Sequence, residues 1–390
     1  MNLPGLRRTG RVIVLGVFSL LAASSLAAQQ SYGFIARLGR DTLVVERVTR
    51  TADRLEGTVV SRTPRVLVRR YAAELAPDGT VRRFDVTTTI PNAGPNTLRE
   101  QVISVGFGAD SLTVTIRAAD STSTLKVAAG GLALPWYVYA YGTWEQMFTV
   151  ARRRGADSLP VTGYTPGNRT ANRTFVRRHA GDSLAVGLFG DVMAARVSPE
   201  GRLLGMNGDR TTVKVRVERL EQVDVEAIAA RFTAEEASAG VASALSPRDT
   251  VRATIGGAEI VVDYGRPGRR GRQILGQVVP WNAVWRTGAN EATQFTTSRD
   301  LVFEGGVTVP AGTYTLWTLP APEGVALIIN RQTGQWGTQY DSSRDLARVP
   351  LKVESIAEPV ERFTIRIEPV NGGGRLVVEW DTFRWTANFN

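Results

Sequence analysis

The sequence predicts a mainly β protein with two β-rich domains, and three observations carry this prediction. Short stretches of alternating apolar and polar residues, rich in β-branched side chains, recur along most of the chain. Turn-forming groups such as Pro-Asp-Gly at 77–79 and Asn-Gly-Asp at 207–209 separate them. A chain of 390 residues, 43% hydrophobic and 22% charged, is long enough to bury more than one core.

The first 28 residues predict a signal peptide. Three arginines precede an apolar run over residues 12–23, and small residues follow at 25–28. We expect cleavage after Ala27 or Ala28 and export to the periplasm or the exterior. The apolar run is short for a bilayer, so we expect no membrane span after cleavage. The chain has no Cys, which excludes disulfides and a thioether lipid anchor.

Residues 29–222 predict an antiparallel β-meander or curved sheet with one or two short helices. Alternating segments at 42–48, 65–71, 80–90, 111–117, 193–198 and 211–220 are its expected strands. A phrase of Gly, Asp, Ser or Thr, and Leu recurs at 39–43, 108–112, 155–159 and 181–184. We interpret this repeated sequence motif as a hairpin corner that recurs along the meander.

An aromatic stretch at 132–154 leaves two interpretations open. It gathers six rings and then a helix-like segment that ends in three arginines. The stretch is either a strand and helix that plug the open side of the curved sheet, or the wall of a cavity for an apolar or sugar ligand. The candidates for such a cavity are Trp136, Tyr139, Tyr141 and Trp144.

Helical spacing returns in residues 223–245, which predict a linker helix. Residues 246–390 then alternate again, as in 361–370 and 375–381, where apolar side chains occupy every second position. This pattern, without a long helix, predicts a C-terminal β-sandwich with jelly-roll-like connections.

Several long motifs of the C-terminal region resemble a known family. They are "SPRDTVRATIGGAEIVVDYGRPGRRGRQILG", "VPWNAVWRTGANEATQFTTSRDLVFEGGVTVPAGTYTLWTLP", "INRQTGQWGTQYDSSRDLARVPL" and "RLVVEWDTFRW". In this order, over about residues 246–388, they resemble the bacterial domain of unknown function 2911. The resemblance implies a secreted or periplasmic β-rich module and no established activity. Residues 29–222 lie outside it.

The corner "WRTGANEAT" at 285–293 concentrates polar groups between two expected strands. Arg286, Asn290 and Glu291 offer a guanidinium, an amide and a carboxylate, which form either a closed network or part of a polar ligand site. We expect a near-buried pair between Arg286 and Glu291. The remaining ligand-binding candidates are Tyr264, Arg266 and Arg270, in or next to the basic 265–272 loop, and Trp336 and Tyr340 of the "WGTQY" motif.

The residue inventory restricts catalysis. A single histidine, His179, and the absence of Cys exclude His-rich zinc motifs and thiol nucleophiles. Glu291 with Asp263, or Asp341 with Asp345, are the carboxylate pairs available for glycoside hydrolysis. We predict no catalytic residues, no metal site and no cofactor.

The charge distribution guides the choice of function. The net charge is +10, but the first 28 residues carry three of the arginines, and residues 246–390 are nearly neutral, with 16 basic and 15 acidic residues. The excess is spread over residues 29–245, so we expect no nucleic-acid partner. The leading hypothesis is an exported, non-catalytic binding protein for a glycan or another hydroxylated or anionic envelope ligand. A glycan-acting hydrolase and a structural envelope protein are the alternatives.

Overall fold

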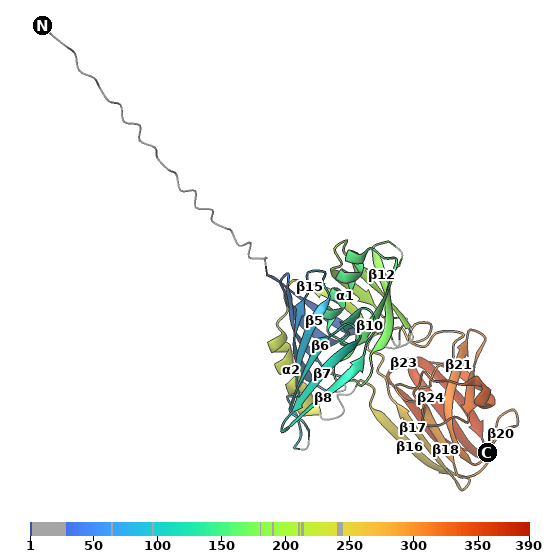
Figure 1. The fold of residues 1–390 in the computed structure, drawn as a ribbon. Helices are drawn as coiled ribbons and strands as arrows, with labels where there is room; N and C mark the ends of the chain where they lie inside the picture. The colour runs from blue at the N-terminus through green and yellow to red at the C-terminus, as the bar shows by residue number, and fades with distance from the viewer. Residues whose placement is uncertain are drawn as a thin grey trace.

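The computed structural model describes residue 1 and residues 29–63, 65–95, 97–179, 181–188, 191–209, 211, 214–239 and 245–390. The expected signal peptide, apart from Met1, lies outside the described residues. The described chain is mainly β, with two sheets and two α-helices (Figure 1). The predicted fold class is therefore confirmed.

The first sheet is an antiparallel meander for most of its width. Consecutive strands pair from β1 to β8 and from β10 to β15, β1 pairs with β15, and β9 adds in parallel to β10. Its strands are β1 (Gln30–Leu38), β2 (Asp41–Arg50), β3 (Arg54–Ser61), β4 (Leu67–Leu75), β5 (Val81–Thr89), β6 (Glu100–Phe107), β7 (Ser111–Ala118), β8 (Ser121–Ala128), β9 (Ala133–Pro135), β10 (Ser158–Tyr164), β11 (Asn172–Arg178), β12 (Ser183–Leu188), β13 (Asp191–Val197), β14 (Leu203–Asn207) and β15 (Arg216–Leu220).

Helix α1 (Tyr141–Arg154) packs into the core of this sheet, and Figure 1 shows it among the strands. All of its residues from 141 to 151 are buried, and it ends at Gly155, whose φ of 63° is left-handed. Trp136 packs edge-on against Trp144 with ring centroids 5.9 Å apart. Trp136, Tyr141 and Trp144, three of the four residues expected at an apolar cavity, are buried in the core of the first sheet.

Helix α2 (Val225–Ala239) covers a separate apolar patch of the same sheet. Val225 and Phe232 are buried against Ile35, Val45 and Val60. Asp224 caps the helix by accepting from the backbone N–H of Ala227 at 2.8 Å. The helix predicted within 223–245 is therefore packed on β1, β2 and β3 through residue 239, so it does more than connect the two sheets.

The repeated Gly-Asp-Ser/Thr-Leu phrase has two structural roles. At 39–43, 108–112 and 181–184 it forms the corners between β1 and β2, β6 and β7, and β11 and β12, as predicted. At 155–159 it instead joins the end of α1 to β10. At three of the four places the Gly is left-handed, namely Gly39, Gly155 and Gly181, and this conformation suits a helix end as well as a hairpin.

The second sheet encloses its own aromatic core. Strand β23 pairs with β22 through residues 345–351 and with β24 through residues 352–370, so the sheet bends around the core. After β18 the chain forms β19 and β20 beside β24 before it returns to β21 next to β18. Its strands are β16 (Arg248–Ile255), β17 (Ala258–Gly265), β18 (Thr293–Thr297), β19 (Leu301–Phe303), β20 (Val307–Val309), β21 (Gly312–Ala321), β22 (Gly324–Asn330), β23 (Asp345–Val370) and β24 (Gly373–Phe389).

The two sheets meet at the corner between β1 and β2. Arg270, from the loop after β17, pairs with Asp41 and donates from Nη2 to the carbonyl oxygen of Leu245 at 3.1 Å. Gly39 lies so close that a Cβ there would be 2.2 Å from the Arg270 carbonyl oxygen. We call this contact the seam.

Candidate functional site

A cavity of about 790 Å³ lies beside the seam, between the two sheets. We call it the inter-sheet cavity. Both sheets contribute to its wall, which contains three of the ligand-binding candidates, Arg286, Asn290 and Trp336, and one aromatic candidate, Tyr139. Its lining residues are Leu38, Leu43, Thr63, Tyr139, Lys214, Leu245, Ser246, Pro267, Arg272, Val278, Trp285, Arg286, Gly288, Ala289, Asn290, Trp336, Thr338 and Trp380.

The floor of the cavity is the corner after Trp285. The Trp285 ring stacks on Trp380 with centroids 5.9 Å apart and meets Phe363 edge-on at 5.1 Å. Buried Thr287 accepts at its carbonyl from the Thr293 hydroxyl at 2.7 Å. Tight packing thus holds the corner, and its polar side chains are carried on a rigid base.

Asn290 lies next to Glu291, which forms an isolated β-bridge with Trp336. The carbonyl oxygen of Asn290 accepts from the Gly337 N–H at 2.9 Å and from Nη1 of Arg286 at 3.4 Å. Trp336 is 47% exposed, an unusual surface position for a large ring. An exposed indole face beside an exposed amide suits stacking and hydrogen bonding to a sugar ring.

The first sheet contributes Tyr139 and an apolar strip to the cavity. Tyr139 has a left-handed backbone, with φ 75°, and is half-buried. Burial raises the pKa of its hydroxyl, although Arg69 opposes the shift, so the hydroxyl stays protonated at neutral pH. It therefore offers a hydrogen-bond donor next to the apolar side chains of Leu38 and Leu43.

Arg272 places a partly desolvated cation in the wall. Its Nη2 donates to the carbonyl oxygen of Gly268 at 2.6 Å and its Nε to that of Arg269 at 3.1 Å. Burial, followed by repulsion from Arg270, lowers the pKa of Arg272 to about 10. The group remains charged at neutral pH, and a cation in a poorly solvated position interacts strongly with an anionic ligand.

Three ligand-binding candidates have structural roles instead. Tyr264 is fully buried, and its hydroxyl oxygen accepts from the backbone N–H of Ile365 at 2.9 Å. Arg266 pairs with Asp249 at 2.9 Å and donates to the carbonyl oxygen of Phe363 at 3.1 Å. Arg270 forms the seam. In the structure the polar atoms of these three residues join strands and sheets.

Glu291 does not form the near-buried pair that we expected with Arg286, because its side chain is 47% exposed. Glu291 instead accepts from Nη1 of Arg248 at 2.7 Å, and Asp263 binds the other nitrogen of the same guanidinium. Glu291 and Asp263 therefore do converge, as the carboxylate-pair hypothesis requires. Their side chains are 47% and 39% exposed, however, and Arg248 lies between them, which is a surface ion-pair arrangement.

The second carboxylate pair and the remaining candidate also serve the fold. Asp341 caps the short 3₁₀ helix Ser342–Arg344 by accepting from the N–H of Ser343 at 3.0 Å. Tyr340 donates to Asp345 at 2.8 Å and packs on Trp317 at a centroid distance of 5.0 Å. These contacts assign Asp341, Asp345 and Tyr340 to loop structure.

One buried carboxylate in the first sheet was not anticipated from the sequence. Glu46 is fully buried and accepts from the Tyr71 hydroxyl at 2.6 Å and from the first N–H groups of α1 at Tyr141 and Gly142. Burial raises the pKa of Glu46 to about 8, although the bonds from Tyr71, Gly142 and Tyr141 act in the opposite direction. Glu46 lies in an alternating strand, "TLVVERV", and nothing in that pattern marks an inward-facing acid.

The single histidine of the chain, His179, lies at a turn of the first sheet. His179 is exposed at the hairpin between β11 and β12, where its N–H donates to the Ser183 carbonyl oxygen at 2.9 Å. Within the described ranges no group of three or more His, Asp or Glu side chains is arranged to hold a metal ion. In the same ranges no helix has the length and apolar character needed to cross a bilayer.

By its fold, the described chain is a mainly β protein built from two sheets. Residues 246–389 match the model of the family described as protein of unknown function DUF2911, which confirms the resemblance seen in the sequence, and the first sheet has no family match. A comparison with curated proteins gave no match.

Two solved structures are similar at low identity. A DUF1089 family protein from Pseudomonas aeruginosa is 12% identical over 42% of this chain and 89% of that chain, with a TM-score of 0.31. A beta-barrel-like protein of domain of unknown function DUF1849 from Brucella abortus is 12% identical over 49% of this chain and 94% of that chain, with a TM-score of 0.32.

Proposed function

We propose that this protein is an exported binding protein that holds a glycan or a similar hydroxylated, partly anionic envelope ligand in the inter-sheet cavity. The observation that carries the proposal is the composition of the cavity wall. An exposed indole, an exposed amide, a tyrosine hydroxyl and two guanidinium groups from Arg272 and Arg286 face one space of about 790 Å³. This volume is within the range typical of small-molecule sites.

The charge of the wall favours an anionic component in the ligand. Lys214, Arg272 and Arg286 line the cavity, and the described residues of its lining include no Asp or Glu. A uronic acid or a phosphate-substituted sugar would combine ring stacking on Trp336 with ionic contacts to these cations. A neutral sugar would use only the first of these interactions and should bind more weakly.

A glycan array with the full protein tests the proposal. The array contains bacterial envelope oligosaccharides in matched neutral and uronate-bearing forms, and hits are confirmed by titration calorimetry. Trp336→Ala should weaken a hit by about tenfold or more, because one well-stacked aromatic contact is typically worth about 1 to 2 kcal/mol. Asn290→Gly keeps a residue that tolerates the left-handed backbone at φ 65° and removes the amide, so it should also weaken binding.

Trp281→Ala is the matched control. Trp281 is 41% exposed on the same sheet but does not line the cavity, so its removal should leave affinity unchanged. Equal losses for both Trp variants, or no hit among anionic glycans, would refute the proposal. Release of new reducing ends during incubation would instead favour the hydrolase hypothesis, with Asp263→Asn and Glu291→Gln as the variants to test.

Export is the second part of the proposal and rests on the residue pattern of the first 28 positions. N-terminal sequencing of protein from its native host should find a chain that begins at Ala28 or Gln29. Recovery of a chain with Met1 in place would refute export by this route.

A further inference from the structure

A group of cations lies at the other end of β1, away from the inter-sheet cavity. Two adjoining hollows of about 390 and 640 Å³ share Gln30 and Arg202 in their walls. The first also contains Tyr32, Arg219 and Glu221, and the second contains Arg50, Glu145, Arg152, Arg153 and Glu200. We call the two hollows together the arginine cleft.

The arginine cleft is separate from the proposed glycan site. Gln30 begins β1, and Leu38, at the far end of the same strand, lines the inter-sheet cavity. A strand of this length spans about 26 Å, so one ligand of ordinary size does not occupy both places.

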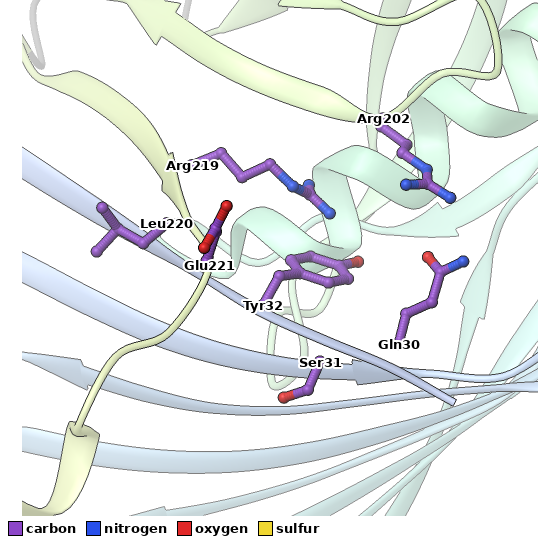
Figure 2. A pocket seen from close by; sticks show the side chains of 7 residues that line it. All are labelled: Gln30, Ser31, Tyr32, Arg202, Arg219, Leu220 and Glu221. Carbon is purple, nitrogen blue, oxygen red and sulfur yellow. The ribbon is translucent and has the colours of Figure 1, made fainter. Parts of the chain in front are cut away.

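One cation of the cleft is already committed to a buried acid. Glu145 is 1% exposed and accepts from Nη1 of Arg219 at 2.5 Å, from the Leu203 N–H at 2.7 Å and from the Tyr32 hydroxyl. The Arg219 guanidinium also lies 3.7 Å from the centroid of the Tyr32 ring. Arg219 and Glu145 therefore form a neutral, rigid floor. Figure 2 shows the Arg219 guanidinium over the Tyr32 ring.

The remaining arginines keep most of their hydrogen-bonding capacity. Arg50 donates from Nη2 to Oε1 of Gln146 at 2.5 Å, and Arg152 donates from Nη2 to the carbonyl oxygen of Asp182 at 3.1 Å. Among the described residues, the guanidinium of Arg202 has no hydrogen-bond partner, and Figure 2 shows it directed toward Gln30. Each guanidinium carries five N–H donors, so these contacts orient the side chains without using them up.

Acids do not cancel this charge. With Glu145 neutralised by Arg219, the cleft retains Arg50, Arg152, Arg153 and Arg202 against Glu200 and Glu221, both exposed. A site with a surplus of guanidinium forks on a rigid base suits a ligand that has several acceptor oxygens and more than one negative charge. Phosphate groups meet this description better than a single carboxylate does.

We propose that the arginine cleft binds a phosphate group, with Arg202 as its central contact and Arg50 and Arg152 beside it. The group belongs either to a soluble phosphate ester or to a lipid headgroup, since both present the same oxygens. The cleft thus gives the protein a second site, independent of the glycan site in position and in ligand chemistry.

Calorimetric titration of the full protein with inorganic phosphate tests this proposal. Wild type should bind phosphate with an affinity that falls as salt is raised. Arg202→Gln and Arg50→Gln should each weaken binding by about tenfold, the usual effect of losing a charge-assisted hydrogen bond. Glu221→Gln should strengthen phosphate binding, because it removes from the wall of the cleft a negative charge that repels phosphate.

Arg154→Gln is the matched control. Arg154 is exposed at the end of α1, next to Arg152 and Arg153, but lines neither hollow. Its loss should leave phosphate affinity within about twofold of wild type, as expected for a screened surface charge. Equal weakening by Arg154→Gln and Arg202→Gln would show non-specific attraction and would overturn the proposal, as would the absence of phosphate binding. Acetate binding as tight as phosphate would overturn the choice of ligand.

Vesicles distinguish the two sources of the phosphate group. Sedimentation with vesicles that contain phosphatidic acid, lost in Arg202→Gln and absent with phosphatidylcholine alone, supports the lipid headgroup. Phosphate binding without sedimentation supports the soluble ester. The readouts use no glycan, so this proposal and the proposed glycan binding fail independently.

Discussion

The backbone N–H of Arg40 donates to the carbonyl oxygen of Arg270 at 3.0 Å, although 230 residues separate the two along the chain. Arg270 adopts a left-handed backbone, with φ 55°, and its side chain, 12% exposed, returns to Asp41. This contact joins the corner of the first sheet to a loop of the second. The inter-sheet cavity lies beside it, so the seam determines the geometry of the proposed glycan site.

Gly39→Ala should weaken the seam. The new Cβ would lie 2.2 Å from the Arg270 carbonyl oxygen, so one of the two backbones must move. We expect a loss of about 2 kcal/mol or more in unfolding free energy, including the cost of a left-handed backbone without glycine. Thermal unfolding and limited proteolysis between α2 and β16 measure it.

Gly155→Ala is a control for the cost of a left-handed backbone without glycine, separate from any clash. Gly155 has a φ of 63°, close to the 60° of Gly39, but a Cβ there meets nothing within 4 Å. It should cost about 1 kcal/mol and leave the proteolysis between the sheets unchanged. Equal losses of unfolding free energy and equal proteolysis in the two variants would show that the seam contributes nothing to stability.

Glu291→Ala should have a small effect on stability. Its partner is Arg248, and the two side chains are 47% and 35% exposed, so solvent screens the pair. We expect a loss of about 1 kcal/mol or less in a urea titration. Trp285→Ala, six positions earlier in the same corner, should cost about 3 to 5 kcal/mol, because that ring is 8% exposed in the core. A large loss for Glu291→Ala would reinstate the buried network expected from the sequence.

Arg219→Ala should be strongly destabilising. It leaves Glu145, whose side chain is 2% exposed, without its cation. Breaking a buried pair from one side typically costs about 3 to 5 kcal/mol, and chemical denaturation should show a loss of this size. Arg37→Ala removes a pair between β1 and Glu218 of β15, the strand that also carries Arg219, but there the side chains are 38% and 63% exposed, so its cost should be about 1 kcal/mol or less. Similar costs for the two variants would contradict this account.

Glu46 should make the protein less stable as the pH rises. Burial raises its pKa in the folded state from 4.5 to about 8, so between these values the folded chain binds more protons than the unfolded chain. The stabilisation is therefore complete below about pH 4.5 and is lost as the pH passes 8, by an amount on the order of 3 to 5 kcal/mol.

Glu46→Gln tests this pH dependence. The amide does not titrate, so the fall in unfolding free energy between pH 5 and about 8 should disappear. Glu226→Gln, at an exposed ion pair with Arg47, should retain the wild-type fall. A Glu46→Gln protein with the wild-type pH profile would assign the fall to another group.

Local pattern was sufficient to predict the fold class. Period-two alternation identified strands such as β5 and the second half of β23, because a strand with one buried face must place apolar side chains at every second position. Helical spacing likewise identified α2. The C-terminal family was evident from contiguous motifs, which do not require knowledge of the three-dimensional contacts.

The candidate site was only partly predictable, because local pattern does not show which distant segments meet. Arg286, Asn290 and Trp336, three of the candidates named from the sequence, line one cavity, and they belong to nearby turns of one sheet. Tyr139 faces the same cavity from the other sheet, and its neighbours Trp136 and Trp144 turn into the core, although all three belong to one aromatic stretch.

The tertiary structure decided which charged side chains pair with each other. The sequence placed Glu291 near Arg286, but strand pairing brings Arg248 beside it, and a guanidinium binds whichever carboxylate the fold presents. Glu46 and Glu145 became buried acids only because α1 packs into the curved first sheet and brings donors to them. The sequence alone determined which segments form strands and helices, because that depends on residues close along the chain. Packing between distant segments decided which side chains face a cavity, a partner or the core.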